Sequence, residues 1–284
     1  NPKPREGSAV SKDPLSVKDL TFWEENGYVV VRQAVPLKNC RAAERAVWAF
    51  AGIDPEDSET WYPDEPRGIM KEIYQHQSLW DNRQYPRVHE AFSQIWKTEK
   101  LLVSQDRASI NPPERAGYEF KGPWLHWDRE LDPSHDVAGV QGILYLNDTP
   151  ANQGAFTCVP GFHVRLREWL DGLPEEAKPR GLVREDYGDD AFPVEGKAGD
   201  LVIWNRDLPH GSSPNSGARP RVSQYITMYK APEAPTAEWR HGQETWWQER
   251  LTGLGGNRKE KEHEEGQTAR LTPLGRKLLG VDPW

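Results

Sequence analysis

Residues 199–225 read GDLVIWNRDLPHGSSPNSGARPRVSQY, and this stretch carries the main evidence for the fold. Gly199 and Asp200 form a turn signal, and the apolar run LVIWN that follows favours a buried strand. His210 comes just after that strand, among Pro and Gly residues that restrict the backbone and would hold its side chain rigidly. Residues 219–230, RPRVSQYITMYK, form a further strand candidate. The segment therefore predicts two strands joined by a loop that carries His210.

The same pattern of short strand candidates separated by Pro, Gly and Asn extends upstream to Leu101. Since the connections between these runs are too short or too rich in turn residues to contain a helix, they favour an all-β barrel or sandwich over a doubly wound α/β fold. The further strand candidates are LLVSQDRASI, GPWLHWD, VAGVQGILYLND and GAFTCVPG, at 101–110, 122–128, 137–148 and 154–161.

Helical patterns surround the predicted β core. Ser16 is placed to cap a helix that ends at Gly27, and residues 28–35, YVVVRQAV, then form a β-branched strand candidate. Further helices are expected at 38–53, closed by Gly52, and at 87–98, 163–173, 236–253 and 271–281. The sequence thus predicts a mainly β core with flanking α-helices.

Length and composition limit the possible organisation. The 284 residues fit one large domain, and we expect a mobile N-terminal arm at 1–16 and a single domain at 17–284. Within that domain we expect a β core at about 101–230 and a C-terminal helical extension at about 231–284. Cys40 and Cys158 are too few for a disulfide framework, so both are expected to be buried thiols in a reducing compartment.

Charge and hydropathy indicate the kind of partner. The formal net charge is −8, which disfavours nucleic acid and anionic membrane surfaces. No apolar run approaches the length of a membrane span, and the N-terminal residues contain no hydrophobic signal core. We therefore expect a cytoplasmic protein that acts on a small molecule, with its oligomeric state left open.

A possible metal site comes from the segment 124–130, WLHWDRE. On an extended backbone, residues i and i+2 project from the same face, so His126 and Asp128 can converge on one ion. By themselves they fit a hydrogen-bonded turn equally well. With His210 they supply two imidazoles and one carboxylate, which is the facial triad of non-haem Fe(II) oxygenases.

A candidate cosubstrate site lies on the strand candidate at 219–230. An oxygenase of this type uses 2-oxoglutarate, whose distal carboxylate needs a fixed cation once it is buried, and a guanidinium forms two parallel hydrogen bonds to such a group. Arg221 follows His210 by 11 residues and shares its strand face with Arg219, Ser223 and Tyr225. We favour Arg221 over Arg219, which lies closer to the turn, and Ser223 could add a hydroxyl donor.

The order of these motifs resembles the phytanoyl-CoA dioxygenase family of Fe(II)/2-oxoglutarate oxygenases, which also includes ectoine hydroxylase. The resemblance extends over roughly residues 20–230 and rests on FWEENGYVVVRQAVP, HWD, PGFH at 160–163, GDLVIW, PHGS and the Arg that follows. One departure is PGFH, where the family commonly has Ser before the His, which affects the pocket entrance and not the metal.

The resemblance implies a double-stranded β-helix, the jelly-roll core. It implies Fe(II) bound by His126, Asp128 and His210, and 2-oxoglutarate bound by Arg221 and, by similarity to ectoine hydroxylase, by Asn111. Such enzymes consume O2 and convert 2-oxoglutarate to succinate and CO2. In related halogenases Gly or Ala replaces the carboxylate, so Asp128 favours hydroxylation.

Several other interpretations stay open at this stage. A non-catalytic or differently metallated jelly-roll module that binds a small ligand is the alternative function. For His163 a local hydrogen bond is favoured over a pocket role, and neighbouring His135 and Asp136 face opposite sides of an extended chain. Gln141 and Tyr145 share one strand face and are weaker pocket candidates. Trp124, Trp127 and Trp204 are expected in the core or pocket wall, and parts of 61–76 and of the Trp-rich C-terminal segment are expected to form a lid.

Overall fold

The computed structural model describes residues 13–62, 69–119, 125–129, 131, 139–174, 181–251 and 266–284. The helices are α1 (Val17–Asn26), α2 (Leu37–Ala51), the 3-10 helix η1 (Ser58–Trp61), α3 (Gln77–Arg83), α4 (Pro86–Trp96), α5 (Phe162–Asp171), α6 (Arg184–Tyr187), α7 (Ala237–Gln248) and α8 (Pro273–Leu279). The strands are β1 (Tyr28–Val31), β2 (Met70–Lys71), β3 (Leu101–Val103), β4 (Ala108–Asn111), β5 (Val140–Tyr145), β6 (Phe156–Cys158), β7 (Phe192–Val194), β8 (Leu201–Asn205), β9 (His210–Ser212), β10 (Arg221–Tyr225) and β11 (Met228–Lys230).

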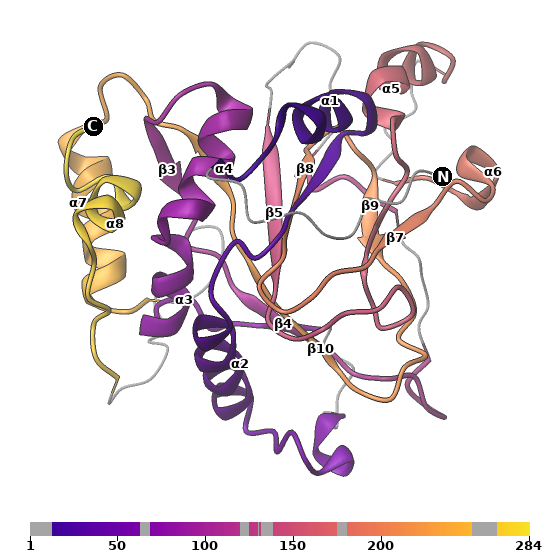
Figure 1. Cartoon of the computed structure of the whole chain (residues 1–284), viewed down its shortest axis with the longest axis horizontal. Coiled ribbons are helices and arrows are strands. Elements are labelled where there is room, and N and C mark those ends of the chain that lie inside the picture. The colour runs from indigo at the N-terminus through magenta and orange to yellow at the C-terminus, as the bar shows by residue number, and fades with distance from the viewer. Residues whose placement is uncertain are drawn as a thin grey trace.

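Antiparallel sheets form the centre of the molecule. The larger sheet has six strands in the order β1-β8-β5-β10-β4-β2, and a smaller sheet has the order β7-β6-β9. Figure 1 shows the strands of the smaller sheet to the right of the larger sheet, with helices α3, α4, α7 and α8 on the left. The predicted jelly-roll core with flanking helices is therefore confirmed.

Alternation along the strands explains why the larger sheet is buried on both faces. In β8, Leu201 and Ile203 belong to the apolar cluster on the helix side, whereas Val202 and Trp204 belong to a second cluster that also contains residues of the smaller sheet. Strand β5 divides in the same way, because Leu144 lies in the first cluster and Ile143 in the second. The near-continuous apolar run at 201–204 is therefore the sequence signature of a strand with two covered faces.

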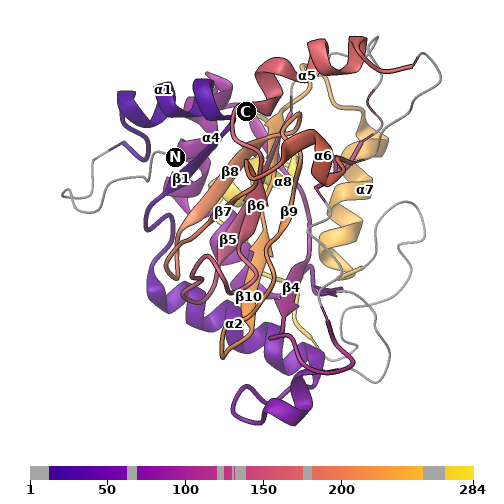
Figure 2. The same cartoon turned by 90° about the vertical axis from the view of Figure 1, so that its right-hand side faces the viewer.

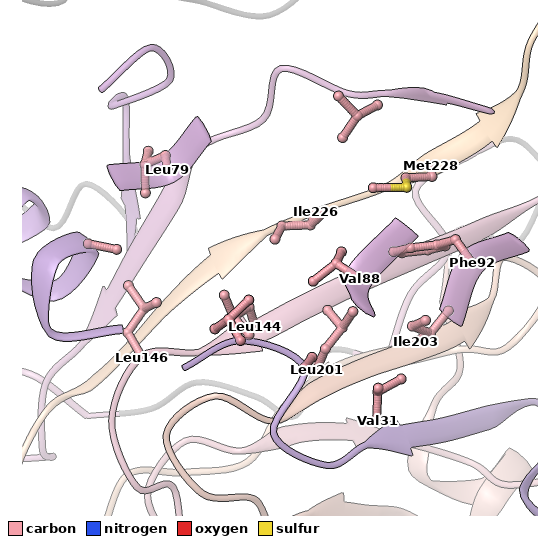
Figure 3. Packing of buried hydrophobic residues seen from close by; sticks show 14 of the residues in the cluster. Val31, Leu79, Val88, Phe92, Leu144, Leu146, Leu201, Ile203, Ile226 and Met228 are labelled. Carbon is pink, nitrogen blue, oxygen red and sulfur yellow. The ribbon is translucent and has the colours of Figure 1, made fainter. Parts of the chain in front are cut away.

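The helix-side cluster joins the sheet to α4. Figure 3 shows Val88 and Phe92 of α4 close to Leu201 and Ile203 of β8, with Ile226 beside them. Helix α8 packs on β3, and α4 packs on β11, so the C-terminal helices extend the same layer. In Figure 2, α1 and α5 lie at one end of the strands and α2 at the other.

The N-terminal part of the fold agrees with its predicted caps and differs in its boundary. Ser16 caps α1 by accepting a hydrogen bond from the Asp19 amide, and Gly27 ends that helix in the left-handed conformation. Residues 1–12 of the predicted arm lie outside the described part. Leu15, however, is 2% exposed and exchanges two hydrogen bonds with Gln94, so ordered structure begins before the predicted boundary at residue 17.

Two features of the β core differ from the expectation. Strand β1 pairs with β8, so the core includes residues 28–31 as well as the predicted range of about 101–230. The candidate strand at 122–128 is described only from residue 125, where His126 forms isolated bridges and no continuous ladder. Within the described ranges, no helix combines the length and the apolar composition that crossing a bilayer requires.

Candidate metal and cosubstrate site

A cavity of about 1040 Å³ opens among the strands, and it contains the residues that the sequence singled out. Its wall includes His126 and Asp128 from the segment before β5, His210 from β9, and Arg221 from β10. These elements are distant in the sequence, so the larger and smaller sheets together assemble the site.

His126, Asp128 and His210 each present one ligand atom, and these three atoms all lie within 4.8 Å of one another. Main-chain hydrogen bonds fix their arrangement, because the His126 amide donates to the His210 carbonyl at 2.9 Å and the His210 amide donates back at 3.0 Å. Trp127, between these two candidate ligands in sequence, points the other way and donates its indole N–H to the main-chain carbonyl of Asp207. The predicted i, i+2 convergence is thus present without a regular strand.

The carboxylate of Asp128 faces both imidazoles. Its Oδ1 lies 3.4 Å from Nε2 of His126, and its Oδ2 lies 3.3 Å from Nε2 of His210. Hydrogen bonds with His126 and then His210 hold the pKa of Asp128 well below its usual range, although burial acts in the opposite direction. Gln141 of β5 donates from Nε2 to Asp128 Oδ2 at 2.6 Å, which fixes the plane of the carboxylate.

The surroundings of His210 fix its ring. The imidazole Nδ1 lies 3.0 Å from the Leu208 carbonyl oxygen, an interaction that leaves Nε2 directed towards Asp128. The rings of Trp204 and Phe156 lie 5.1 Å and 6.0 Å from the His210 ring and form an aromatic wall of the cavity. Trp204 is therefore pocket wall, as expected, while Trp127 packs against Phe162 in the core.

Arg221 is a buried cation in the same cavity. Its guanidinium is fully buried and donates to the Gly154 carbonyl at 2.8 Å and to the hydroxyls of Ser212 and Ser109 at 3.3 and 3.2 Å. All three acceptors are neutral, and the buried Nε atom of Arg221 has no hydrogen-bond partner. Among the residues that the structure describes, no carboxylate forms an ion pair with Arg221.

Asn111 lies directly opposite Arg221 in the β4–β10 ladder. It is 5% exposed, lines the cavity, and its buried amide nitrogen has no hydrogen-bond partner. Gly154 leaves room for it, because a Cβ at that position would lie 2.2 Å from Nδ2 of Asn111. The cavity thus offers an unused amide donor beside an uncompensated guanidinium.

Ser223 and Arg219 are placed differently from Arg221. Ser223 is buried and hydrogen bonds through its hydroxyl to Ser109 at 2.7 Å, and it is absent from the residues that line the cavity. The Ser109 hydroxyl contacts both the Ser223 hydroxyl and the guanidinium of Arg221, so the predicted role of Ser223 towards a ligand stays a prediction. Arg219 has an exposed side chain, and it too is absent from the residues that line the cavity.

The weaker candidates have structural partners. The Tyr145 hydroxyl donates a hydrogen bond to the Val194 carbonyl and accepts one from the Phe156 amide, so it is hydrogen-bonded as donor and as acceptor within the core. Nε2 of His163 lies 3.2 Å from the Glu24 carbonyl oxygen of α1, a longer-range contact than the local one expected, and burial lowers the pKa of His163. His135, Asp136 and Trp124 lie outside the described residues.

Sequence reasoning missed three cavity features. The cavity is also lined by Ser212 and by the neighbouring residues Asp106 and Arg107. The third feature is Ser109, whose hydroxyl accepts a hydrogen bond from the Arg221 guanidinium. Parity along β4 would have placed Ser109 and Asn111 on one face. No local pattern marks Asp106, because its segment is irregular and its position depends on tertiary contacts. Of the predicted lid at 61–76, residues 63–68 are outside the described part, while Ile69 and Met70 line the cavity.

The residues present fit Fe(II) and 2-oxoglutarate by their chemistry. Two imidazoles and one carboxylate are the donor set of the facial triad, which leaves coordination positions for further ligands. A buried guanidinium without a counter-charge, next to an unpaired amide donor, matches a dicarboxylate. Both features belong to one cavity.

Comparison with known proteins places this arrangement in context. Residues 23–223 match the family model described as phytanoyl-CoA dioxygenase (PhyH). A Dictyostelium discoideum protein named for the same family is 23% identical over 272 residues, an alignment that covers 78% of this chain and 77% of that protein. An ectoine dioxygenase from Bordetella bronchiseptica is 25% identical over 160 residues, or 50% of each chain.

A solved structure supports the fold independently of close sequence similarity. EvdO2 from Micromonospora carbonacea var. aurantiaca, determined in complex with 2-oxoglutarate, superposes with a TM-score of 0.54 at 16% identity. The superposition covers 78% of this chain and 94% of EvdO2.

Proposed function

Because this chain belongs to the phytanoyl-CoA dioxygenase family and is thus an Fe(II)- and 2-oxoglutarate-dependent dioxygenase, we propose that it hydroxylates a small molecule at the His126–Asp128–His210 cluster. Fe(II), once bound, supplies the oxidation of substrate by O2, coupled to conversion of 2-oxoglutarate to succinate and CO2. The protein positions the reactants and shields them from solvent.

One observation carries the proposal: Arg221 is a buried cation with only neutral partners, and it shares a cavity with the three ligand side chains. A buried charge is stabilised when an opposite charge reaches it, and the distal carboxylate of 2-oxoglutarate supplies that charge. Asn111 would donate a further hydrogen bond to the cosubstrate. Ser223 would act indirectly, through the Ser109 hydroxyl that supports the guanidinium.

Asp128 supports hydroxylation over halogenation. A halogenase of this type needs the carboxylate position vacant for halide, and here the carboxylate lies between the two imidazoles. The residual open positions then belong to the cosubstrate and O2.

We also propose that the chain forms one oxygenase domain with a C-terminal helical extension at about 231–284. Strand β1 pairs with β8, and α8 packs on β3, so both ends of the described chain contact the β core. This proposal retains the predicted organisation, with an ordered boundary that includes Leu15.

The first test is anaerobic titration of the metal-free protein with Fe(II) and 2-oxoglutarate. We expect the weak visible charge-transfer band of a chelated complex, and we expect His126→Ala to lose it. Metal binding without the band would instead favour the alternative, a metal-containing module that binds another small ligand. His89→Ala is a matched control, because His89 contacts the Glu99 carbonyl, away from the cluster.

A second test separates the roles of the carboxylate. Asp128→Ala should abolish substrate-coupled succinate formation, since one of the three ligands is lost. Undiminished succinate formation in Asp128→Ala would contradict the metal assignment. The reaction outcome is then tested by supplying chloride both to Asp128→Gly and to the unaltered protein. We expect no chlorinated product from the unaltered protein.

A further inference from the structure

A second carboxylate, that of Asp106, lines the cavity that contains the metal cluster. Asp106 precedes β4 and is partly buried. Its Oδ1 accepts a hydrogen bond from the Arg107 amide at 2.8 Å. Across the described ranges, Asp106 forms no ion pair with any Lys, Arg or His. The Asp106 carboxylate therefore lies at the cavity wall without an ion-pair partner among the described residues.

Two guanidiniums act on the charge of Asp106, and neither forms an ion pair with its carboxylate within the described ranges. Arg107 also lines the cavity, and it donates to Glu72 at 2.9 Å, a carboxylate that is not among the lining residues. Arg83 donates to the carbonyl oxygens of Tyr74 and of Asp106 itself, which holds the main chain of this segment. Both guanidiniums lower the pKa of Asp106, yet burial outweighs them and raises it.

A polar network holds the Asp106 segment rigidly. Gln105 accepts a hydrogen bond from Gln75 at 2.7 Å and donates one to Gln243 of α7 at 2.9 Å. Main-chain hydrogen bonds hold the segment on both sides of Asp106. The Ser104 amide donates to the Thr227 carbonyl at 2.8 Å, and the Tyr225 amide donates to the Arg107 carbonyl at 3.0 Å. A carboxylate on such a braced segment is preorganised for a ligand, and binding would not require the segment to become ordered.

Most of the remaining charges on the cavity wall have the same sign as Asp106, and Arg107 is the cation that remains among the described lining residues. Once metal and 2-oxoglutarate have taken up Asp128 and Arg221, the lining carboxylates are Asp106, Glu114 and Glu119, and Arg107 is paired with Glu72. Glu114 and Glu119 are exposed, whereas Asp106 is partly buried, so a cation would gain most from contact with Asp106. Apolar side chains of Ile69, Met70 and Ile143 line the same space.

We propose that Asp106 binds a positively charged nitrogen group of the substrate, such as an ammonium, amidinium or guanidinium, while the apolar part of the substrate lies against Ile69 and Ile143. The proposal deepens the proposed function, because it rests on the cavity being the oxygenase active site. It assigns a substrate class: a cationic small molecule whose charged end contacts Asp106 and not the three candidate metal ligands. Asp106 would thus determine specificity and would not take part in the chemistry.

The test compares hexylamine with hexan-1-ol, probes that differ mainly in charge. Binding is followed by saturation-transfer NMR on protein loaded with 2-oxoglutarate and redox-inert Zn(II). We expect hexylamine to bind at least about tenfold more tightly than hexan-1-ol, and Asp106→Asn to reduce that ratio to about twofold or less. Hexan-1-ol affinity should be unchanged in Asp106→Asn, which also shows that the variant is folded.

Glu119→Gln is the matched control. It removes the same charge from an exposed position on the same cavity and should leave the ratio within about twofold of its original value, since solvated charges are screened. Equal or tighter binding of hexan-1-ol, no binding of hexylamine, or a preference that survives Asp106→Asn would overturn the proposal. The Fe(II)–2-oxoglutarate band separates the two hypotheses, because it tests the oxygenase function without requiring Asp106.

Discussion

Asn111 and Arg221 are paired directly across the antiparallel ladder of β4 and β10, and both side chains reach the cavity that contains the His126–Asp128–His210 cluster. The pairing places a neutral donor and a permanent cation side by side on a rigid support. Because neither group has a carboxylate partner among the described residues, we propose that the two together bind an anion next to the candidate metal ligands.

Arg221→Gln should therefore weaken 2-oxoglutarate binding by about 30-fold or more, because the variant removes the buried charge and keeps only a shorter, uncharged polar side chain. Arg219→Gln changes an exposed side chain and should leave the affinity within about twofold. The measurement is the 2-oxoglutarate dependence of the anaerobic charge-transfer band. If Arg219→Gln produced the larger loss, the cosubstrate role would pass to Arg219.

Gly154→Ala should weaken 2-oxoglutarate binding by about tenfold, because the added methyl group would displace Asn111 and disturb the carbonyl that Arg221 contacts. Gly154 has φ +65°, so part of the effect is backbone strain of about 1–2 kcal/mol.

Gly52→Ala controls for that strain, because Gly52 has φ +66° and open space where a Cβ would lie. Both variants should lower the free energy of unfolding, and only Gly154→Ala should change cosubstrate affinity. Similar 2-oxoglutarate affinities in the two variants would refute a role for the close approach of Gly154 to Asn111.

Gln141→Leu should lower the affinity for Fe(II) by about 10- to 100-fold, because Gln141 holds one oxygen of the Asp128 carboxylate. Co(II) titration of the metal-free protein, followed by the d–d absorption, gives the affinity without turnover. Gln248→Leu, on the exposed part of α7, is the control with the same side-chain change. Unaltered Co(II) affinity and spectrum in Gln141→Leu would show that the carboxylate is oriented by the two imidazoles alone.

Asp106→Asn should raise the thermal stability of the metal-free protein at pH 7. Burial raises the pKa of Asp106 in the folded state above the ordinary value of 3.8, so the folded state binds the proton more tightly than the unfolded state. Ionisation of Asp106 therefore costs stability as pH rises above 3.8, and Asn avoids that cost. The advantage of the variant should shrink as pH falls towards 3.8.

Asp148→Asn provides the opposite case. Its carboxylate accepts from the Ala198 amide and pairs with Lys197, and these contacts lower the pKa of Asp148. Its ionisation stabilises the fold above the unfolded pKa and that contribution is lost on acidification. The measurement is the melting temperature of each variant from pH 4 to 8. At pH 7, relative to the unaltered protein, the melting temperature should rise for Asp106→Asn and fall for Asp148→Asn. A lower melting temperature for Asp106→Asn at pH 7 would contradict the account.

Much of the β core was predictable, because its strands are apolar runs separated by turn residues and its first helices carry standard caps. The predictions for α1 and α2 succeeded since Gly27 and Gly52 end them in the left-handed conformation. The strand β9 was missed, because its three residues show no alternation and its pairing with β6 is a tertiary feature. His210 accordingly lies at the start of a strand and not in a loop.

The candidate ligands were predictable from their order and spacing, and the supporting groups were not. Strand parity alone makes Gln141 a cavity candidate, and its hydrogen bond to Asp128 depends on how the segment before β5 returns over the sheet. Ser223 shares the face of Arg221, yet the intervening Ser109 comes from a neighbouring strand that sequence parity cannot position. Contacts between distant segments decide these details.

The chain of glutamines from Gln75 through Gln105 to Gln243 ties α7 to the residue beside Asp106, whereas the cluster of His126, Asp128 and His210 is held by the sheets. The segment of Asp106 is thus braced by α7 as well as by the larger sheet, since the Tyr225 amide of β10 donates to the Arg107 carbonyl. A sequence change in α7 would reach Asp106 through Gln243 and Gln105, whereas the main-chain pairing of His126 with His210 does not involve α7. We therefore expect changes in α7 to alter the proposed substrate selection before they alter the proposed metal site.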